Sequence, residues 1–244
     1  MNDILQALSR AFRGMLHPQM LALAIWPMLV ALALWIVLAW LYGDSWAQWL
    51  SAALTGSNAG QWLSQHNLDR FVHYSALMLL LLVLALAPLI LITALLIAAM
   101  IEMPLIVNFV AARHYPTLDK RRGGTVPGSI FNALIAVLVF AGLWIVTLPL
   151  WLTGVLMPVV PVILSAYLTQ RLFRYDALSD HAGAEEYRAI LKASWGRMYV
   201  LGFLLAMLYY VPVFNLLVPI LSGLAFTHFG LAELARLRRV KGEG

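Results

Sequence analysis

Four long runs without a charged residue constrain this 244-residue chain more than any other feature of its sequence. Over 30, 31, 48 and 35 residues there is no Lys, Arg, Asp or Glu, and the runs cover Gly14–Gly43, Phe71–Ile101, Gly123–Gln170 and Met198–Ala232. Hydrophobic residues make up 63% of the chain and charged residues 11%, whereas soluble domains have about 45–50% and about 25%. A water-soluble fold of this size cannot bury so much apolar surface, so we expect an integral membrane protein.

The first two runs each fit one membrane crossing, because a spanning helix needs about 20 apolar residues. We therefore predict transmembrane helices over residues 20–42 and 76–99. The other two runs are longer and contain prolines near their centres, which predicts a helical hairpin in each, over residues 130–170 and 199–234. The first arm of the second hairpin, Tyr199–Tyr210, reaches only about 18 Å, against a hydrocarbon core of about 30 Å. We expect that hairpin to penetrate partway, and the first hairpin fits either a full or a partial crossing.

Residues 1–16 and 180–197 each place apolar side chains at helical spacing on one face. This pattern predicts amphipathic helices in the headgroup plane of the membrane. The predicted fold class is thus an all-α integral membrane protein, one membrane domain over residues 1–244. It has two long transmembrane helices, two proline-broken hairpins that cross fully or partly, and interfacial helices.

Basic residues predict the orientation of the chain. The stretch Asp44–Arg70 holds one basic residue, Arg70, and the other fifteen lie in four segments. These are Arg10 and Arg13, then residues 113–122, 171–197 and 236–241. Because cytoplasmic loops carry an excess of Lys and Arg, we expect all four segments and both termini in the cytoplasm. The +5 charge is explained in this way, without a nucleic-acid partner.

The motifs of known enzymes and metal sites are missing from the sequence. The six histidines form no HExxH pair, the chain has no GxSxG, P-loop or GxGxxG motif, and it contains no cysteine. We therefore predict a protein that is not an enzyme and has no catalytic residues, no metal and no cofactor.

Two groups of arginines are candidates for binding an anion. Arg121 and Arg122 precede Gly123 and Gly124 shortly before a predicted helix, and glycine-rich backbone beside cations favours an oxyanion or a lipid phosphate. Arg171 and Arg174 lie at the foot of the first hairpin. The alternative for both groups is a basic loop that only sets topology.

Three further polar residues are candidates for a pore or the bundle interior. Glu102 follows 31 uncharged residues, and an acid at mid-membrane depth costs about 2.5–3.5 kcal/mol, so it marks either a functional site or the wet end of a helix. Asn215 lies at the tip of the second hairpin and His228 on its returning arm.

Several short segments resemble the CysZ-type sulfate permeases of the etoposide-induced-protein superfamily. The resemblance begins with Phe12-Arg13-Gly14, Pro18 and Pro27, and includes Met103-Pro104-Leu105 and Tyr175-Asp176. Its most specific part is Tyr210-Val211-Pro212-Val213-Phe214-Asn215-Leu216-Leu217-Val218-Pro219. The resemblance implies two long membrane helices, partly penetrating hairpins, cytoplasmic termini, homo-oligomers and sulfate uptake for cysteine biosynthesis.

The chain departs from that family at two places. Leu21 and Ala22 occupy positions where the family tends to have an arginine pair, and Val110-Ala111-Ala112 replaces a segment that tends to contain an acid. Our hypothesis is a multi-pass permease or channel-like protein of the bacterial inner membrane, passing an inorganic anion, with sulfate as the best guess. Its expected partners are membrane lipids, the anion and further copies of the chain. The alternative is a membrane-organising or partner-binding protein of the same fold that transports nothing.

Overall fold

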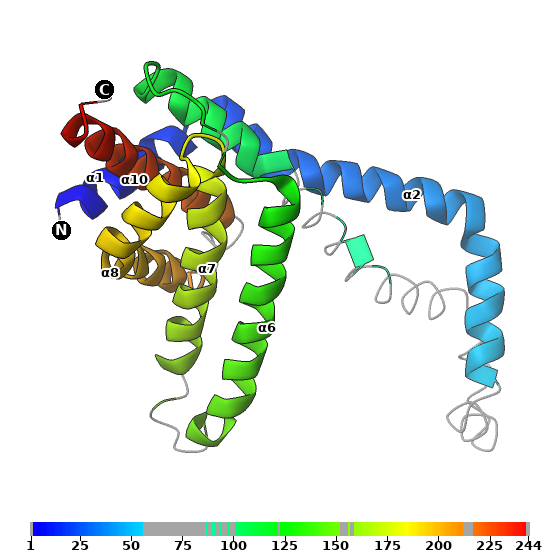
Figure 1. Cartoon of the computed structure of the whole chain (residues 1–244). Coiled ribbons are helices and arrows are strands. Elements are labelled where there is room, and N and C mark those ends of the chain that lie inside the picture. Colours follow the sequence, from blue (N-terminus) through cyan, green and yellow to red (C-terminus); the bar gives the residue numbers. More distant parts are fainter. Residues whose placement is uncertain are drawn as a thin grey trace. The chain divides into compact units, whose positions relative to one another are not determined.

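The structure is a computed structural model that describes residues 2–55, 86, 89–90, 93, 97, 101–121, 123–151, 156, 159–211 and 217–242. All regular secondary structure in these ranges is helical (Figure 1). The labelled helices are α1 (Asn2–Met15), α2 (Pro18–Thr55), α6 (Val126–Trp151), α7 (Val159–Ser179), α8 (Ala184–Leu208) and α10 (Val218–Val240). A further helix covers residues 101–114. The chain divides into two compact units, Met1–Ala24 with Ile101–Gly244, and Ile25–Met100.

The helix α2, which begins in the first unit and continues into the second, contains the predicted crossing 20–42 but does not end there. It continues through Gly43 and Asp44 to Thr55, so the predicted boundary at residue 42 is wrong. A single glycine and one acid do not stop a helix that has good helix formers on both sides. The other predicted crossing, 76–99, lies almost wholly outside the described residues. Within it, Thr93 is helical, and its hydroxyl accepts a hydrogen bond of 3.1 Å from Trp35 Nε1 of α2.

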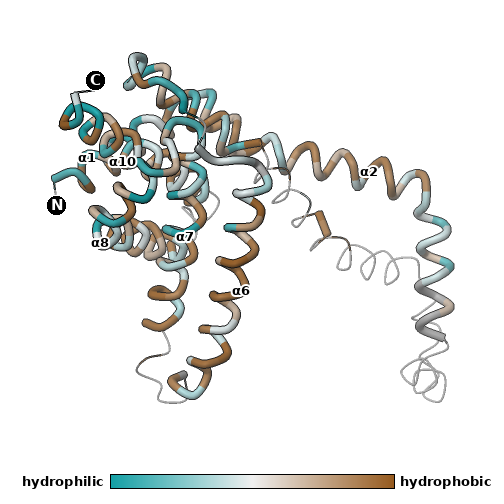
Figure 2. The backbone as a smooth tube through the Cα atoms, viewed as in Figure 1, coloured by the Kyte–Doolittle hydropathy of each residue, from teal (hydrophilic) through white to brown (hydrophobic). Residues whose placement is uncertain are grey.

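The first predicted hairpin is confirmed as two helices that pack side by side, α6 and α7 (Figure 1). The helix α7 continues past the predicted end at Gln170 to Ser179. At 1.5 Å per residue, the 26 residues of α6 reach about 39 Å, longer than the hydrocarbon core. Most apolar side chains of α6 are exposed in the unit, and Figure 2 shows this helix as largely hydrophobic.

The second predicted hairpin corresponds to α8 and α10, but its first arm is not short. Residues 180–197 and 199–210 do not form an interfacial helix followed by a separate arm, because α8 runs unbroken over Ala184–Leu208. Its buried face continues through Ile190, Ser194, Met198 and Leu201, so packing holds the charged half and the apolar half in one helix. The depth that this hairpin reaches in a membrane stays a prediction.

The helix α10 is the centre of the first unit. It packs against α1, α7 and α8, and nearly every residue of it from Val218 to Leu231 is buried. The N-terminal helix α1 is confirmed as a helix, but part of its predicted lipid-facing surface is buried, with Ile4 and Met15 inside the unit. Its place in the headgroup plane stays a prediction.

Four of the described helices contain a segment long and apolar enough to cross a membrane. These segments are Pro18–Trp49, Pro127–Leu150, Ala184–Leu208 and Val218–Val240. The protein is therefore an all-α membrane protein, as its composition predicts.

Candidate functional site

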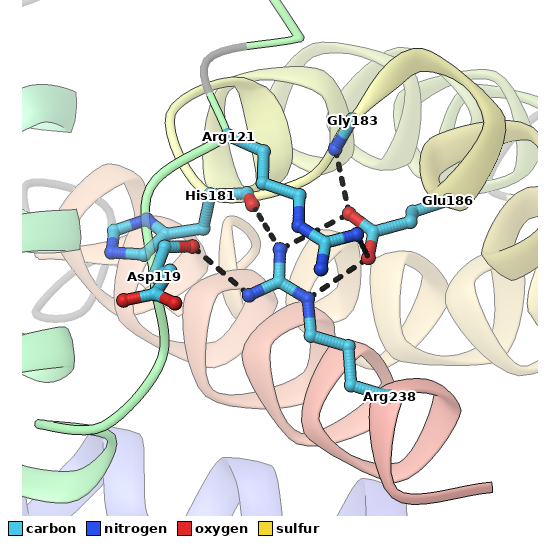
Figure 3. Close-up of polar contacts among 6 residues, drawn as sticks. All are labelled: Asp119, Arg121, His181, Gly183, Glu186 and Arg238. Atoms are coloured by element: carbon cyan, nitrogen blue, oxygen red, sulfur yellow. Dashed lines mark hydrogen bonds and ion pairs between the residues drawn. The ribbon is translucent and has the colours of Figure 1, made fainter. Parts of the chain in front are cut away.

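A closed network of charges joins the two ends of the second hairpin (Figure 3). Arg238, near the end of α10, donates two hydrogen bonds to the Glu186 carboxylate, from Nε to Oε1 over 2.9 Å and from Nη2 to Oε2 over 3.1 Å. It also donates to two backbone carbonyl oxygens, those of Asp119 at 3.0 Å and His181 at 2.7 Å. The network therefore links α8, α10, the turn between α7 and α8, and the loop before α6.

The Glu186 carboxylate, like the Arg238 guanidinium, has several hydrogen-bond partners. Its Oε2 accepts a hydrogen bond of 2.7 Å from the backbone N–H of Gly183, which closes the N-terminal cap of α8. Its Oε1 also accepts from Arg121 Nη1 at 3.0 Å. Arg238 is 3% exposed and Glu186 4%, and a buried ion pair of this kind is stable only when the remaining donors and acceptors are also bonded. This network is therefore structural.

His181 lies in the same turn, outside the candidate membrane segments. Burial is the largest cause and lowers the pKa of its ring. The nearby positive charges of Lys120 and Arg238 lower this pKa further, whereas the negative charge of Asp180 raises it. Its Nδ1 is buried and has no hydrogen-bond partner among the described residues. The ring is therefore kept neutral beside the Arg238 guanidinium.

The glycine loop that the sequence predicted as an anion site is docked onto the turn after α7. The backbone N–H groups of Arg121, Gly123 and Gly124 donate to the carbonyl oxygens of residues 181, 182 and 179, over 3.3, 3.0 and 2.9 Å. A Cβ atom at Gly123 would lie 2.3 Å from a carbonyl oxygen, and one at Gly124 would lie 2.5 Å from Ser179 Cβ. The two glycines are thus needed for close approach of two backbones, and their N–H groups are already used. Arg122 lies outside the described residues.

The two arginines of α7 have a different environment. Arg174 is 9% exposed, and its Nη1 donates over 2.7 Å to the side-chain oxygen of Gln170. Arg171 donates from Nη1 to the hydroxyl of Tyr167 over 2.9 Å. In the described part of the chain neither guanidinium has a carboxylate within ion-pair distance, and the Nε atoms of both are buried without a hydrogen-bond partner.

Groups from α6 and α8 complete the surroundings of these arginines. Asn132 of α6 donates to the carbonyl oxygen of Arg171 over 3.1 Å, and the hydroxyl of Tyr187 on α8 lies next to Arg174. The Tyr187 ring packs edge-on against Tyr175, with 5.7 Å between the ring centres. Both tyrosines line a cavity of about 190 Å³ that Gly123 and Gly124 also line. Tyr187 thus borders both the cavity of the glycine loop and Arg174, whereas neither Arg171 nor Arg174 lines that cavity.

The pore candidates are not part of this region. Glu102 is the second described residue of the helix 101–114, and its side chain makes no hydrogen bond or ion pair with another described residue. His228 is buried in α10, its ring centre lies 4.8 Å from that of His114, and its Nδ1 has no hydrogen-bond partner among the described residues. Asn215 lies outside the described residues. Among the residues that the structure describes, no three His, Asp or Glu side chains are grouped as a metal ion would require.

The Arg238–Glu186 pair is not among the residues predicted from the sequence. The sequence does contain a signal for Glu186, which stands three residues after Gly183 at the start of a helix. This is the spacing of the glutamate in a capping box. Nothing local distinguishes Arg238 from the neighbouring Arg236 and Arg239. Its burial depends on which face of α10 meets α8.

The sequence matches the family described as sulfate transporter CysZ/etoposide-induced protein 2.4 over residues 7–219, which is most of the chain. No curated protein and no solved structure matches it. The match confirms the resemblance that the segments from Phe12 to Pro219 indicated. The chain therefore belongs to the EI24 family of sulfate transporter-like membrane proteins.

Proposed function

We propose that this protein is a permease or channel-like protein of the bacterial inner membrane that passes an inorganic anion, with sulfate for cysteine biosynthesis as the best candidate. The observation that carries the proposal is the pair Arg171 and Arg174 on α7, whose guanidinium groups bind only neutral groups among the described residues. Family membership supports the same class of function.

A buried cation without a carboxylate is costly unless another negative charge approaches it. Moving a charge out of water costs far more than a single neutral hydrogen bond returns, and buried charges in proteins are normally paired. Arg171 and Arg174 are three residues apart, so they project from neighbouring turns on one side of α7. A guanidinium offers two parallel N–H groups to an oxyanion, and the buried Nε atoms of both arginines have no hydrogen-bond partner among the described residues.

The alternative, a membrane-organising protein that transports nothing, is favoured by the glycine loop. Its N–H groups bond to backbone carbonyls, so they are no longer free to hold an anion. If Arg171 and Arg174 only stiffen the junction of α6, α7 and α8, the whole region is architectural.

The orientation of the chain is part of the proposal, with both termini in the cytoplasm. This orientation is supported by contacts that the four basic segments make with each other or with neighbouring residues of the same segments. Arg197 pairs with Asp3, Arg121 and Arg238 pair with Glu186, and Arg10 Nη1 lies 3.5 Å from the hydroxyl of Tyr115. Segments in contact share one side of a membrane, and the positive-inside rule assigns that side to the cytoplasm. The exposed apolar surface of α6 is available for lipid or for a second copy in a homo-oligomer.

The test is sulfate flux into liposomes that contain the purified protein. We expect Arg174→Gln to lower the flux at least about tenfold, because it removes a charged hydrogen-bond donor while keeping a polar side chain. Arg171→Gln should have the same direction of effect. The matched control is Arg13→Gln, which removes one positive charge from an exposed position of α1.

The outcome separates the two functions. A loss confined to the α7 variants, with unchanged insertion and folding, supports the permease. Equal flux for wild type, Arg174→Gln and protein-free liposomes would reject transport of sulfate and favour the membrane-organising alternative.

A further inference from the structure

A second cluster of arginines surrounds a cavity between α1 and α10, on helices other than α7. The cavity has a volume of about 520 Å³. Its ionisable lining side chains are Asp3, Arg10, His228, Glu233, Arg236 and Arg239. The family match and the proposed transport function give this cavity no role.

The two carboxylates of the cavity are held by one arginine that does not line it. Arg197 Nη1 lies 3.0 Å from Asp3 Oδ2, and its Nη2 lies 2.8 Å from Glu233 Oε2. Arg197 Nη1 also donates to the second oxygen of Glu233 over 3.0 Å. Asp3 Oδ1 keeps no hydrogen bond with any described residue, so one carboxylate oxygen on the cavity wall is free to accept.

The three lining arginines lack such partners. In the described ranges, Arg10, Arg236 and Arg239 have no carboxylate within ion-pair distance, and Arg10 reaches only the hydroxyl of Tyr115. Four arginines, with Arg197 included, against two carboxylates leave the cluster with a net charge of +2. A cavity with this charge is suited to a doubly charged anion.

His228 adds a neutral polar group to the wall. It is 2% exposed, and its Nδ1 is buried and has no partner among the described residues. A buried ring nitrogen without a partner is unfavourable, and a ligand in the adjoining cavity would offer it one.

We propose that the α1–α10 cavity binds a phosphate monoester group, supplied either by the headgroup of an anionic lipid or by free phosphate. Such a group carries about −1.5 to −2 charge at pH 7, which matches the net charge of the cluster. Arg10, Arg236 and Arg239 bind its oxygens, and arginine forks match this geometry. The exposed Val240 side chain at the rim, 81% accessible, provides an apolar contact for an acyl chain when the phosphate belongs to a lipid.

The free oxygen of Asp3 makes the site selective for phosphate over sulfate. The second pKa of a phosphate monoester is about 6, so a fraction of it carries a proton near neutral pH and donates it in a hydrogen bond to the carboxylate. Sulfate has no proton at this pH, and its oxygens are repelled by the same carboxylate. The cavity is thus expected to have a ligand different from that of the α7 arginines, and the two proposals fail independently.

The experiment measures binding by the purified full chain in neutral lipid nanodiscs. The probes are inorganic phosphate, sulfate, and vesicles that contain phosphatidic acid or, at equal surface charge, phosphatidylglycerol. We expect the double variant Arg10→Gln and Arg239→Gln to bind the phosphate probe about a hundredfold more weakly, roughly tenfold for each arginine removed. The control double variant, Arg13→Gln and Lys241→Gln, makes the same change of charge on or next to the same helices and should stay within about twofold.

Two further variants separate recognition from folding. Arg236→Gln removes a side chain that makes no hydrogen bond with other described residues, so it should weaken phosphate binding and leave the melting temperature unchanged. Asp3→Asn should raise the affinity for sulfate relative to phosphate, an effect that a purely structural aspartate would not produce.

Each outcome decides the proposal. Binding of phosphatidic acid alone, of inorganic phosphate alone, or of both supports a phosphate monoester site and identifies its source. The proposal is overturned if phosphatidylglycerol binds as well as phosphatidic acid, if sulfate competes as well as phosphate, if the control double variant loses as much affinity as the cavity variant, or if no probe binds.

Discussion

Two buried arginines of this protein, Arg238 and Arg174, have opposite surroundings. Arg238 donates to both oxygens of a carboxylate and to two backbone carbonyls. Arg174 donates to a neutral amide and lies next to a tyrosine hydroxyl, and its Nε has no partner in the described part of the chain. Both lie in the same unit, so the difference comes from their immediate neighbours.

The comparison distinguishes Arg238, whose charge stabilises the fold, from Arg174, whose charge is available to a ligand. In a low-dielectric interior an ion pair with all its hydrogen bonds made is costly to break, because removing one partner leaves the other buried and charged. A cation with only neutral partners has already lost part of its solvation, so its removal costs little and its attraction for an incoming anion is large. We therefore expect stability to depend on Arg238 and anion binding to depend on Arg174.

The largest expected effect is that of Arg238→Met on stability. It leaves Glu186 buried with only Arg121 and a backbone N–H, and we expect the free energy of unfolding to fall by about 3–5 kcal/mol. The measurement is reversible unfolding of the purified protein in mixed detergent micelles. Replacing Glu186 and Arg238 together by methionine should restore much of the loss, and a double variant as unstable as the sum of both single variants would contradict a coupled pair.

A smaller effect is expected at Gly202, which positions the partner of Arg174. A Cβ atom there would lie 2.8 Å from the carbonyl oxygen of Ala166 and 3.1 Å from Gln170 Cβ, so Gly202→Ala must push α7 and α8 apart. We expect a loss of about 1–3 kcal/mol in the same unfolding measurement, together with reduced anion flux.

Gly196 on the same helix is the matched control, because a Cβ atom there meets nothing within 4 Å. Gly196→Ala should stabilise the protein by about 0.5–1 kcal/mol, the gain in helix propensity. Destabilisation by both alanines would show that α8 tolerates no change, and the role assigned to the Gly202 contact would be lost.

The smallest expected effect on the free energy of unfolding is that of Arg174→Met. Unlike Arg238→Met, this change is not expected to lower it. Removing a cation with only neutral partners should leave the free energy of unfolding unchanged or raise it by about 1 kcal/mol. A loss as large as the one expected for Arg238→Met would show that both arginines are structural, and the comparison would fail.

Much of the fold could be predicted from local features of the sequence. The charge-free runs and their prolines predicted helical hairpins, and the structure places α6 with α7, and α8 and α10, at those positions. The predicted break before Tyr199 was wrong because charge density was used as a boundary, whereas α8 keeps its charges outside and its buried face continuous. The predicted end of the first crossing at residue 42 differs from the end of α2 for a similar reason, because the charge of Asp44 does not stop a helix that continues to Thr55.

The candidate site could be predicted only in part. The residues Arg171 and Arg174 were identified because few charges border the apolar runs. The role of Gly123 and Gly124 was not predictable, because glycine before a helix serves an anion or a neighbouring backbone equally well. The carbonyl oxygens of residues 179 and 182 decided between these roles.

The sequence by itself determined that this chain is a helical membrane protein and which of its segments are apolar, because hydrophobicity and helical periodicity are local properties. Only the tertiary structure decided which arginines are paired. Arg236, Arg238 and Arg239 are almost equivalent in sequence, yet only Arg238 faces α8 and reaches Glu186. The reason is that the energy of a buried charge depends on groups within a few ångströms, and those groups come from segments 50 or more residues away in the chain.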